Sequence, residues 1–385
     1  MKEKEIYMSE VVDLCRNLVR FPSWNSKVED ALAFMQKYCE NMGFSARIMT
    51  FKNSKGQSVA NLYASYGEGH PHLLFSGHMD VVPSGDDAAW MFPAFEGKID
   101  NNILYGRGIA DMKGGIACFA DACREFVKEN KFQGKISFVI SGDEEEPLVD
   151  GTEKMLEQLH AEGEVFDFAI VGEPSNPKEM GDEIKVGRRG DIVLRITSFG
   201  QQGHTAYPDM VVNPIHNLVG LLNTIQTDNL DNGNKFFGRS TLQITTFDVG
   251  NRASNVVPAQ AYAQIDIRFN SNHTSRSIVD WAEKHIAAAK GKFVLEPEYV
   301  GESFLSPISK NVEMLKDIVF RHTGKIPAYS TAGGTSDARF VKKYCPVVEY
   351  GLTNAFIHKV NECEKVENIE LLQKIYKDFL RGFFS

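Results

Sequence analysis

The chain has 385 residues, a length that allows two or three domains and a substantial hydrophobic core. Its 43% hydrophobic and 24% charged residues are ordinary globular values, which argue against a disordered or fibrous protein. A formal net charge of -9 gives no general attraction to nucleic acid or anionic lipid, so we expect neither partner. No signal-peptide core and no run of about 18 apolar residues is visible, so we expect a soluble cytoplasmic protein. Six cysteines without a CxxC pair predict no disulfide framework.

Strand and helix patterns alternate along most of the chain. Apolar residues at helical spacing predict helices at 11–19, 116–127 and 369–379. Short apolar runs bounded by Gly, Pro or acidic residues predict buried strands at 72–76, 136–140, 166–171 and 346–350. This alternation is typical of an α/β domain with a mainly parallel sheet.

The segment from 187 to 297 has a different pattern. It predicts strands at 192–198, 241–249, 259–269 and 293–295, and helices at 212–224 and 277–289. The resulting β-α-β-β-α-β order is the ferredoxin-like signature. We therefore predict a discontinuous catalytic domain, residues 1–186 and 298–385, interrupted by an inserted α+β domain, residues 187–297.

Two polar residues follow the predicted strand at 72–76. His78 and Asp80 are two residues apart on extended chain, so their side chains point the same way. Ligands bind at this edge in open α/β sheets, and Asp80 is a candidate to orient His78 towards a metal. Taken alone, the pair is better explained as a loop histidine beside a turn aspartate.

Asp111 lies in the Gly-rich segment 106–115, just before the predicted helix at 116–127. In isolation it is best explained as a helix N-cap. The glycines match neither a dinucleotide fingerprint nor a phosphate loop, so the sequence disfavours a nucleotide cofactor.

Acidic residues and a second histidine follow the other predicted strands. The four acids Asp143–Glu146 come after the strand at 136–140, where a solvated acidic loop is the simplest explanation. Four like charges beside a buried strand nevertheless repel one another unless cations compensate them. Glu173 follows the strand at 166–171, and His358 follows the one at 346–350.

Separate segments thus deliver five potential ligands to one edge of the predicted sheet: His78, Asp111, Glu145, Glu173 and His358. Two histidines and three carboxylates suit a pair of divalent ions with one bridging carboxylate, and zinc accepts this mixture of ligands. The sequence therefore predicts a dinuclear metal site.

These motifs resemble those of the peptidase M20 family of dinuclear zinc hydrolases, which includes acetylornithine deacetylase, aminoacylase and glutamate carboxypeptidase. The resemblance covers nearly all 385 residues in order. It rests on the segments SGHMDVVP, GRGIADMKGG, DEEE, GEPS and IHKVNE.

The resemblance implies how the ligands divide between two Zn²⁺ ions, with Co²⁺ able to substitute at one site. His78, Asp111 and Glu173 would hold one ion. Glu145, His358 and the bridging Asp111 would hold the other.

The resemblance also implies catalytic roles for Asp80, Glu144 and His204. Asp80 would brace His78, and Glu144 would be the general base that takes a proton from water and passes it to the leaving amine. The inserted domain would mediate a homodimer, in which His204 reaches the partner's active site and stabilises the oxyanion. On its sequence alone, His204 is equally well explained as a polar residue at the start of a helix.

Within the family, the segments 181–190, 202–208, 255–258 and 331–340 are most similar to members that cleave N-succinyl-LL-2,6-diaminopimelate on the lysine and peptidoglycan route. Such a substrate carries three carboxylates, which require cations and oriented donors. The candidate substrate-binding residues are Arg188, Tyr207, Asn255, Arg268, Gly334, Thr335 and Ser336.

Two residues depart from the family pattern. Asp191 and Glu146 stand where the family usually has small residues, and an acid at 191 could repel a substrate carboxylate or point to solvent. Both concern the acyl group and not the class of reaction. Alternatives are deacylation of acetylornithine, cleavage of a dipeptide, or an inactive relative that binds amino-acid conjugates.

Overall fold

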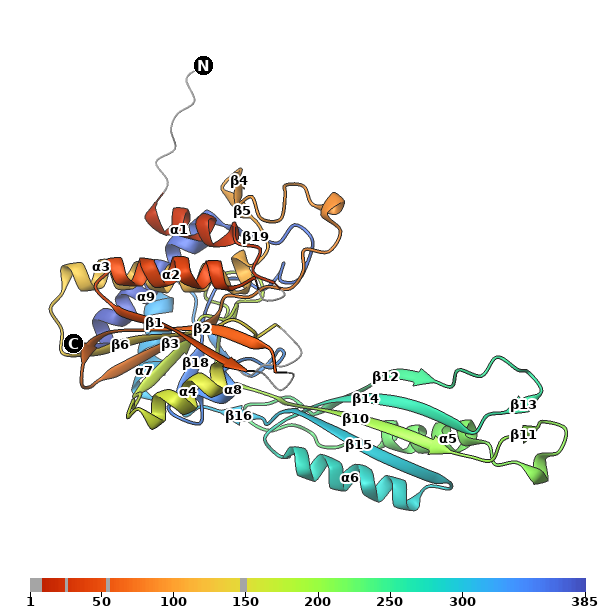
Figure 1. The fold of residues 1–385 in the computed structure, drawn as a ribbon. Helices are drawn as coiled ribbons and strands as arrows, with labels where there is room; N and C mark the ends of the chain where they lie inside the picture. The colour runs from red at the N-terminus through yellow and green to blue at the C-terminus, as the bar shows by residue number, and fades with distance from the viewer. Residues whose placement is uncertain (1–8, 25–26, 53–55, 146–150) are drawn as a thin grey trace. The chain divides into compact units, whose positions relative to one another are not determined.

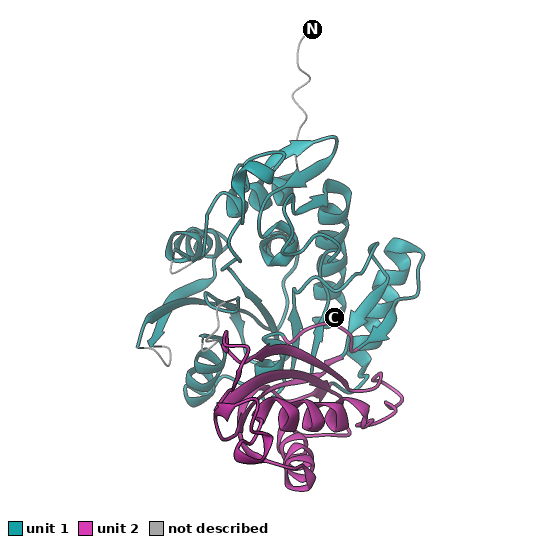
Figure 2. Ribbon diagram, turned by 90° about the vertical axis from the view of Figure 1, so that its right-hand side faces the viewer, with its two compact units in different colours: residues 1–186, 306–330, 336–385 teal, residues 187–305, 331–335 magenta. Residues whose placement is uncertain are grey.

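The computed structural model describes residues 9–24, 27–52, 56–145 and 151–385. The chain forms two compact units (Figure 2). The first comprises residues 1–186, 306–330 and 336–385, and the second comprises residues 187–305 and 331–335.

An eight-stranded sheet forms the centre of the first unit (Figure 1). Its strands lie in the order β1 (Ser45–Lys52), β2 (Ser58–Glu68), β6 (Gly134–Ser141), β3 (His72–His78), β7 (Phe168–Val171), β18 (Val347–Glu349), β8 (Glu183–Lys185) and β17 (Ala328–Ser330). The four strands β6, β3, β7 and β18 run parallel to one another, so their carboxyl ends meet at one edge. Every residue of β3 and β7 is buried, as the unbroken apolar runs predict.

Helices cover this sheet: α1 (Glu10–Val19), α2 (Glu29–Asn41), α3 (Gly114–Glu129), α4 (Gly151–Ala161), α7 (Lys310–Thr323), α8 (Ala338–Val341) and α9 (Val366–Phe383). Helices α1, α3 and α9 pack against one another, and Phe119 of α3 and Tyr376 of α9 contact Phe75 of β3. The unit also contains the short helices η1 (Asp87–Ala89) and η2 (Ile109–Lys113) and the small sheet β4 (Lys98–Asp100), β5 (Ile103–Tyr105) and β19 (Cys363–Lys365).

The second unit has the ferredoxin-like topology. Its main elements are β10 (Gly190–Phe199), α5 (Pro214–Thr227), β12 (Thr241–Asp248), β14 (Gln260–Phe269), α6 (Ser275–Ala288) and β15 (Lys292–Gly301), and the strand order is β12-β14-β10-β15. Alternate residues of β10 and β14 are buried with apolar residues of α5 and α6, which gives this unit a core of its own. The shorter elements are β9 (Gly187–Arg188), β11 (Gly203–His204), η3 (Pro208–Met210), β13 (Val256–Val257) and β16 (Phe304–Leu305).

The second unit ends later than the sequence indicates. The predicted boundary is 298, but the chain returns to the first unit at Ser306. The predicted strand at 293–295 is part of β15, which runs to Gly301 and pairs along β10. Glu296 and Glu298 occupy exposed positions of this edge strand and interrupt the apolar run on which the prediction relied.

Candidate metal centre

The structure brings the five predicted ligands together. His78 ends β3, Asp111 lies in η2, and Glu145, Glu173 and His358 lie in the segments that follow β6, β7 and β18. His78 Nε2 is 3.2 Å from Asp111 Oδ1 and 3.7 Å from Glu173 Oε1. His358 Nε2 is 3.2 Å from Asp111 Oδ2 and 2.8 Å from Glu145 Oε1. Asp111 therefore presents one carboxylate oxygen to each histidine.

Asp111 does not cap the following helix. Helix α3 begins at Gly114, its N-cap residue is Lys113, and no side chain caps it. The backbone at Asp111 is extended, with φ of -124° and ψ of 94°. The alternative explanation of Asp111 as an N-cap is therefore wrong, because its carboxylate faces the two histidines.

Two overlapping groups of potential ligand atoms each lie within 4.8 Å of one another. One contains His78, Asp111 and Glu145, and the other contains His78, Glu144 and Glu173. Glu144 therefore forms a group with His78 and Glu173, the two residues that the family resemblance combines with Asp111. The donor set of imidazole and carboxylate groups fits divalent metal ions such as zinc.

Asp80 connects the first histidine to the acidic segment. Its backbone oxygen accepts a hydrogen bond from His78 Nδ1 at 3.0 Å, and its Oδ1 lies 3.6 Å from the same nitrogen. Its carboxylate accepts the N–H groups of Glu144 at 3.2 Å and Glu145 at 2.8 Å. The second role was not expected from the sequence, because only the fold places β3 beside β6.

Burial and crowded charge alter the ionisation of the cluster. Burial raises the pKa of Glu144 and of Glu173 well above the usual value, and neighbouring carboxylates add to the effect. Burial alone would lower the pKa of His78, but its hydrogen bond to Asp111 and the charge of Asp80 raise it well above the usual value. Hydrogen bonds to Asp111 and Glu145 raise the pKa of His358 to about 10. The carboxylates around both histidines thus concentrate negative charge at this site, which a divalent metal ion would compensate.

The remaining predicted residues lie mostly in the second unit. Arg188 Nη1 donates to the Gly334 carbonyl at 3.1 Å. Arg268 contacts Asp191 at 2.9 Å and binds Asp266 through two nitrogens at 2.9 and 3.1 Å. Asp191, which departs from the family pattern, thus pairs with a candidate substrate-binding arginine.

Three of the predicted residues gather at the β11–β13 pair. The rings of His204 and Tyr207 are 5.8 Å apart, and the backbone oxygen of Asn255 accepts the Thr205 N–H at 3.1 Å. His204 and Tyr207 are both exposed. In the other predicted segment, Thr335 belongs to the second unit and is half-buried.

Ser336 differs from the other candidates because it lies in the first unit and is buried. Its hydroxyl donates to the carboxylate of Glu349. Glu146 lies outside the described residues.

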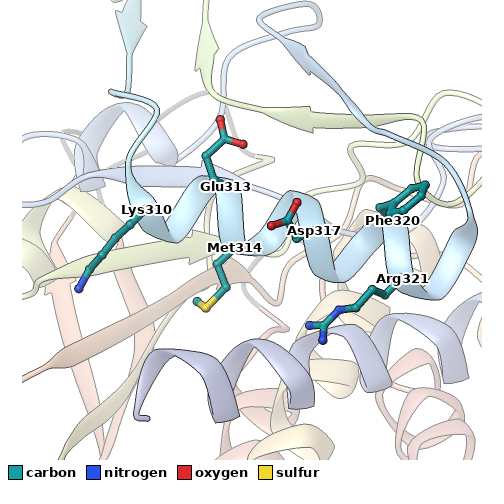
Figure 3. A pocket seen from close by; sticks show the side chains of 6 residues that line it. All are labelled: Lys310, Glu313, Met314, Asp317, Phe320 and Arg321. Atoms are coloured by element: carbon teal, nitrogen blue, oxygen red, sulfur yellow. The ribbon is translucent and has the colours of Figure 1, made fainter.

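A cavity of about 660 Å³ elsewhere on the first unit has no predicted site residue in its lining (Figure 3). Its lining comes from one helix, α7: Lys310, Glu313, Met314, Asp317, Phe320 and Arg321. Neither histidine nor cysteine is among these lining residues.

Within the described ranges, no helix is both long and apolar enough to cross a membrane.

Residues 74–382 match the sequence profile of Peptidase family M20/M25/M40, and the chain belongs to this family. It is therefore a hydrolytic enzyme, and its cluster of potential metal ligands agrees with this class. Several relatives are named succinyl-diaminopimelate desuccinylase. The protein from Rhodospirillum centenum is 44% identical over 97% of both chains, and that from Ehrlichia canis is 42% identical over 97% of this chain and 98% of its own.

Solved structures share the fold. An M20 family metallo-carboxypeptidase from Sulfolobus solfataricus has a TM-score of 0.78 at 19% identity and covers 98% of this chain and 99% of its own. The dinuclear metal-binding peptidase YXEP from Bacillus subtilis has a TM-score of 0.70 at 14% identity and covers 97% of both chains. The prediction of an M20 fold with an inserted α+β domain is confirmed.

Proposed function

We propose that this chain is a metal-dependent amidohydrolase that cleaves N-succinyl-LL-2,6-diaminopimelate to succinate and LL-2,6-diaminopimelate. The observation that carries the proposal is the position of Asp111, whose two oxygens each face a different histidine. The desuccinylase relatives, which align with nearly the whole chain, support this substrate.

Two Zn²⁺ ions are proposed as the cofactors, with Co²⁺ able to replace one of them. His78, Asp111 and Glu173 would hold one ion, and Glu145, His358 and Asp111 would hold the other. Zinc would act as a Lewis acid and bring the pKa of a water molecule close to neutrality. The surrounding cluster supports a pair of cations, because three buried or half-buried ligand carboxylates require positive charge.

Glu144 is proposed as the general base. It would take a proton from the attacking water and deliver it to the amine as the amide bond breaks. The raised pKa of its carboxyl, which burial and neighbouring acids cause, suits a group that must hold this proton between the two steps. Asp80 positions both His78 and Glu144 through the contacts described above.

Substrate recognition and assembly are proposed from the second unit. Arg188 and Arg268 would receive substrate carboxylates, with Tyr207, Asn255 and Thr335 as further contacts. Gly334 of the second unit and Ser336 of the first unit complete the proposed set. The active protein would be a homodimer in the cytoplasm, joined through the second unit, with His204 donating to the oxyanion in its partner's site.

The test measures metal content and product release with the purified chain. We expect about two bound metal ions, loss of activity with a chelator, and recovery with Zn²⁺. Free amine is measured with N-succinyl-LL-2,6-diaminopimelate, N-acetylornithine and a dipeptide, and the succinylated substrate should have the highest kcat/KM. A higher kcat/KM for either other substrate would overturn the substrate assignment, and binding without amine release would identify a non-catalytic relative.

A further inference from the structure

A buried ion pair lies beside the metal-ligand cluster. Arg107 Nη1 donates to Glu362 Oε2 at 2.6 Å, and the side chains are 3% and 1% exposed. These residues lie in the GRGIADMKGG and IHKVNE segments, but the sequence assigned neither a role. Removing such a pair from water is costly. Further hydrogen bonds to each partner offset that cost.

Glu362 holds the backbone of the bridging carboxylate. Its second oxygen, Oε1, accepts the N–H groups of Ala110 at 3.0 Å and Asp111 at 3.3 Å. The backbone N–H of Gly106 also donates to the Glu362 carbonyl at 2.9 Å. Because Glu362 is four residues after His358, the segment that carries one histidine also holds the carboxylate that this histidine contacts.

Arg107 extends this connection to a third segment. Its Nη2 donates to the Pro83 carbonyl at 3.3 Å, and its guanidinium carbon lies 5.4 Å from the centre of the Trp90 ring. Pro83 is the last residue of the SGHMDVVP segment, which carries His78 and Asp80. The pair therefore links the segments that carry His78, Asp111 and His358.

We propose that Arg107 and Glu362 are positioning residues that hold Asp111 between His78 and His358 and thereby set the affinity of the centre for its metal ions. Asp111 can bridge only if each oxygen keeps its direction, and a rotation of its backbone would turn one oxygen away. Hydrogen bonds from backbone N–H groups to a carboxylate are charge-assisted and directional, so they resist this rotation. The inference rests on the metal assignment in the proposed function.

Glu362→Gln is the first test. The variant side chain has nearly the same shape but only one oxygen, and its NH₂ group must face either Arg107 or the two backbone N–H groups. One of the two contacts is therefore lost. Co²⁺ is titrated into the metal-free enzyme, and its visible absorption reports binding. We expect the dissociation constant for Co²⁺ to rise about 10–100-fold. KM at saturating metal should stay unchanged, because neither residue belongs to the proposed substrate-binding set.

Arg107→Lys is the second test and serves if Glu362→Gln does not fold. It preserves the balance of buried charge. A lysine lacks the planar fork that spans Glu362 and Pro83, so Co²⁺ affinity should again fall by about tenfold. Asp121→Asn is the matched control, because Asp121 is also buried and pairs with Arg124 at 2.8 Å. It should lower stability and leave Co²⁺ affinity unchanged.

Unchanged Co²⁺ affinity in the folded variants, or a change no larger than that of Asp121→Asn, would overturn the positioning role. That result would leave the proposed function intact. Failure of the wild-type chain to bind Co²⁺ or Zn²⁺ would overturn the metal assignment itself and this inference with it.

Discussion

At the scale of single residues, neighbouring acids have different environments. Both Glu144 and Glu145 are half-buried, but Glu144 lies close to Glu173, whereas Glu145 makes the direct contact with His358. Both backbone N–H groups are held by Asp80. The proposed division between base and ligand therefore depends on where each side chain points and not on sequence spacing.

Glu144→Gln tests that division. If Glu144 is the base, the variant should retain two metal ions and lose at least about 10²–10⁴-fold in kcat, because the amide cannot accept the proton from water. Metal analysis and steady-state kinetics measure the two effects separately. Glu145→Gln is the matched variant and should lose metal; loss of a metal ion from Glu144→Gln would make Glu144 a ligand.

Arg268→Ala tests recognition of a substrate carboxylate. Loss of a charge-assisted hydrogen bond should lower kcat/KM and reduce transition-state stabilisation by about 1.5–3 kcal/mol. Metal content should stay unchanged. Arg195→Ala is the control, because Arg195 lies on the adjacent strand β10 and makes an exposed ion pair with Glu298. If Arg268→Ala keeps the wild-type kcat/KM, its pairs with Asp191 and Asp266 are purely structural.

At the scale of elements, glycine lets α3 approach the end of β7. A Cβ at Gly115 would lie 2.4 Å from the Gly172 carbonyl oxygen, immediately before Glu173. The contact is with backbone, which cannot move aside as a flexible side chain can. The first turn of α3 therefore packs tightly against the backbone of the segment that carries Glu173.

Gly115→Ala should lower the free energy of unfolding by about 1–3 kcal/mol through overpacking. It should also weaken metal binding, because relief of the clash displaces the segment that carries Glu173. Urea unfolding and metal titration measure these effects. Gly220→Ala in α5 is the control, since no atom lies within 4 Å of its added Cβ; it should stabilise the helix by about 0.5–1 kcal/mol. Equal stability of both variants would contradict the packing argument.

At the scale of the whole molecule, the second unit has its own core and presents His204 and Tyr207 in exposed positions. His204 Nδ1 accepts the Ala206 N–H at 3.0 Å, which orients the ring. The proposed catalytic role of this histidine requires an active site within its reach. The proposed homodimer supplies that site.

Mixing Glu144→Gln chains with His204→Ala chains under conditions that exchange subunits tests the shared site. Each homodimer should be inactive, whereas a heterodimer contains one site with both a normal Glu144 and a normal partner His204. Each heterodimer should therefore regain at most half of the activity of the wild-type dimer. Mass spectrometry of differently tagged chains verifies exchange, and no recovery in exchanged heterodimers would exclude a catalytic His204 in trans.

The sequence by itself determined the α/β alternation, the ferredoxin-like insertion and the ligand types that follow the strands. These features are local: apolar periodicity records burial, and the short segments around His78 and Glu173 fall where predicted strands end. The family resemblance added the expected division of roles. Nothing local, however, distinguished Asp111 as a bridge from Asp111 as a helix cap.

Only the tertiary structure places the Asp111 carboxylate between two histidines and not on the helix N-terminus, because this placement depends on contacts between residues far apart in the chain. His358 meets Asp111 across 247 residues, and Glu362 meets Arg107 across 255. The extent of β15 was also a tertiary matter, since pairing with β10 and not local hydrophobicity carries that strand to Gly301. Periodicity reports how an element is buried, whereas the partners across a sheet or between loops are set by the packing of the whole unit.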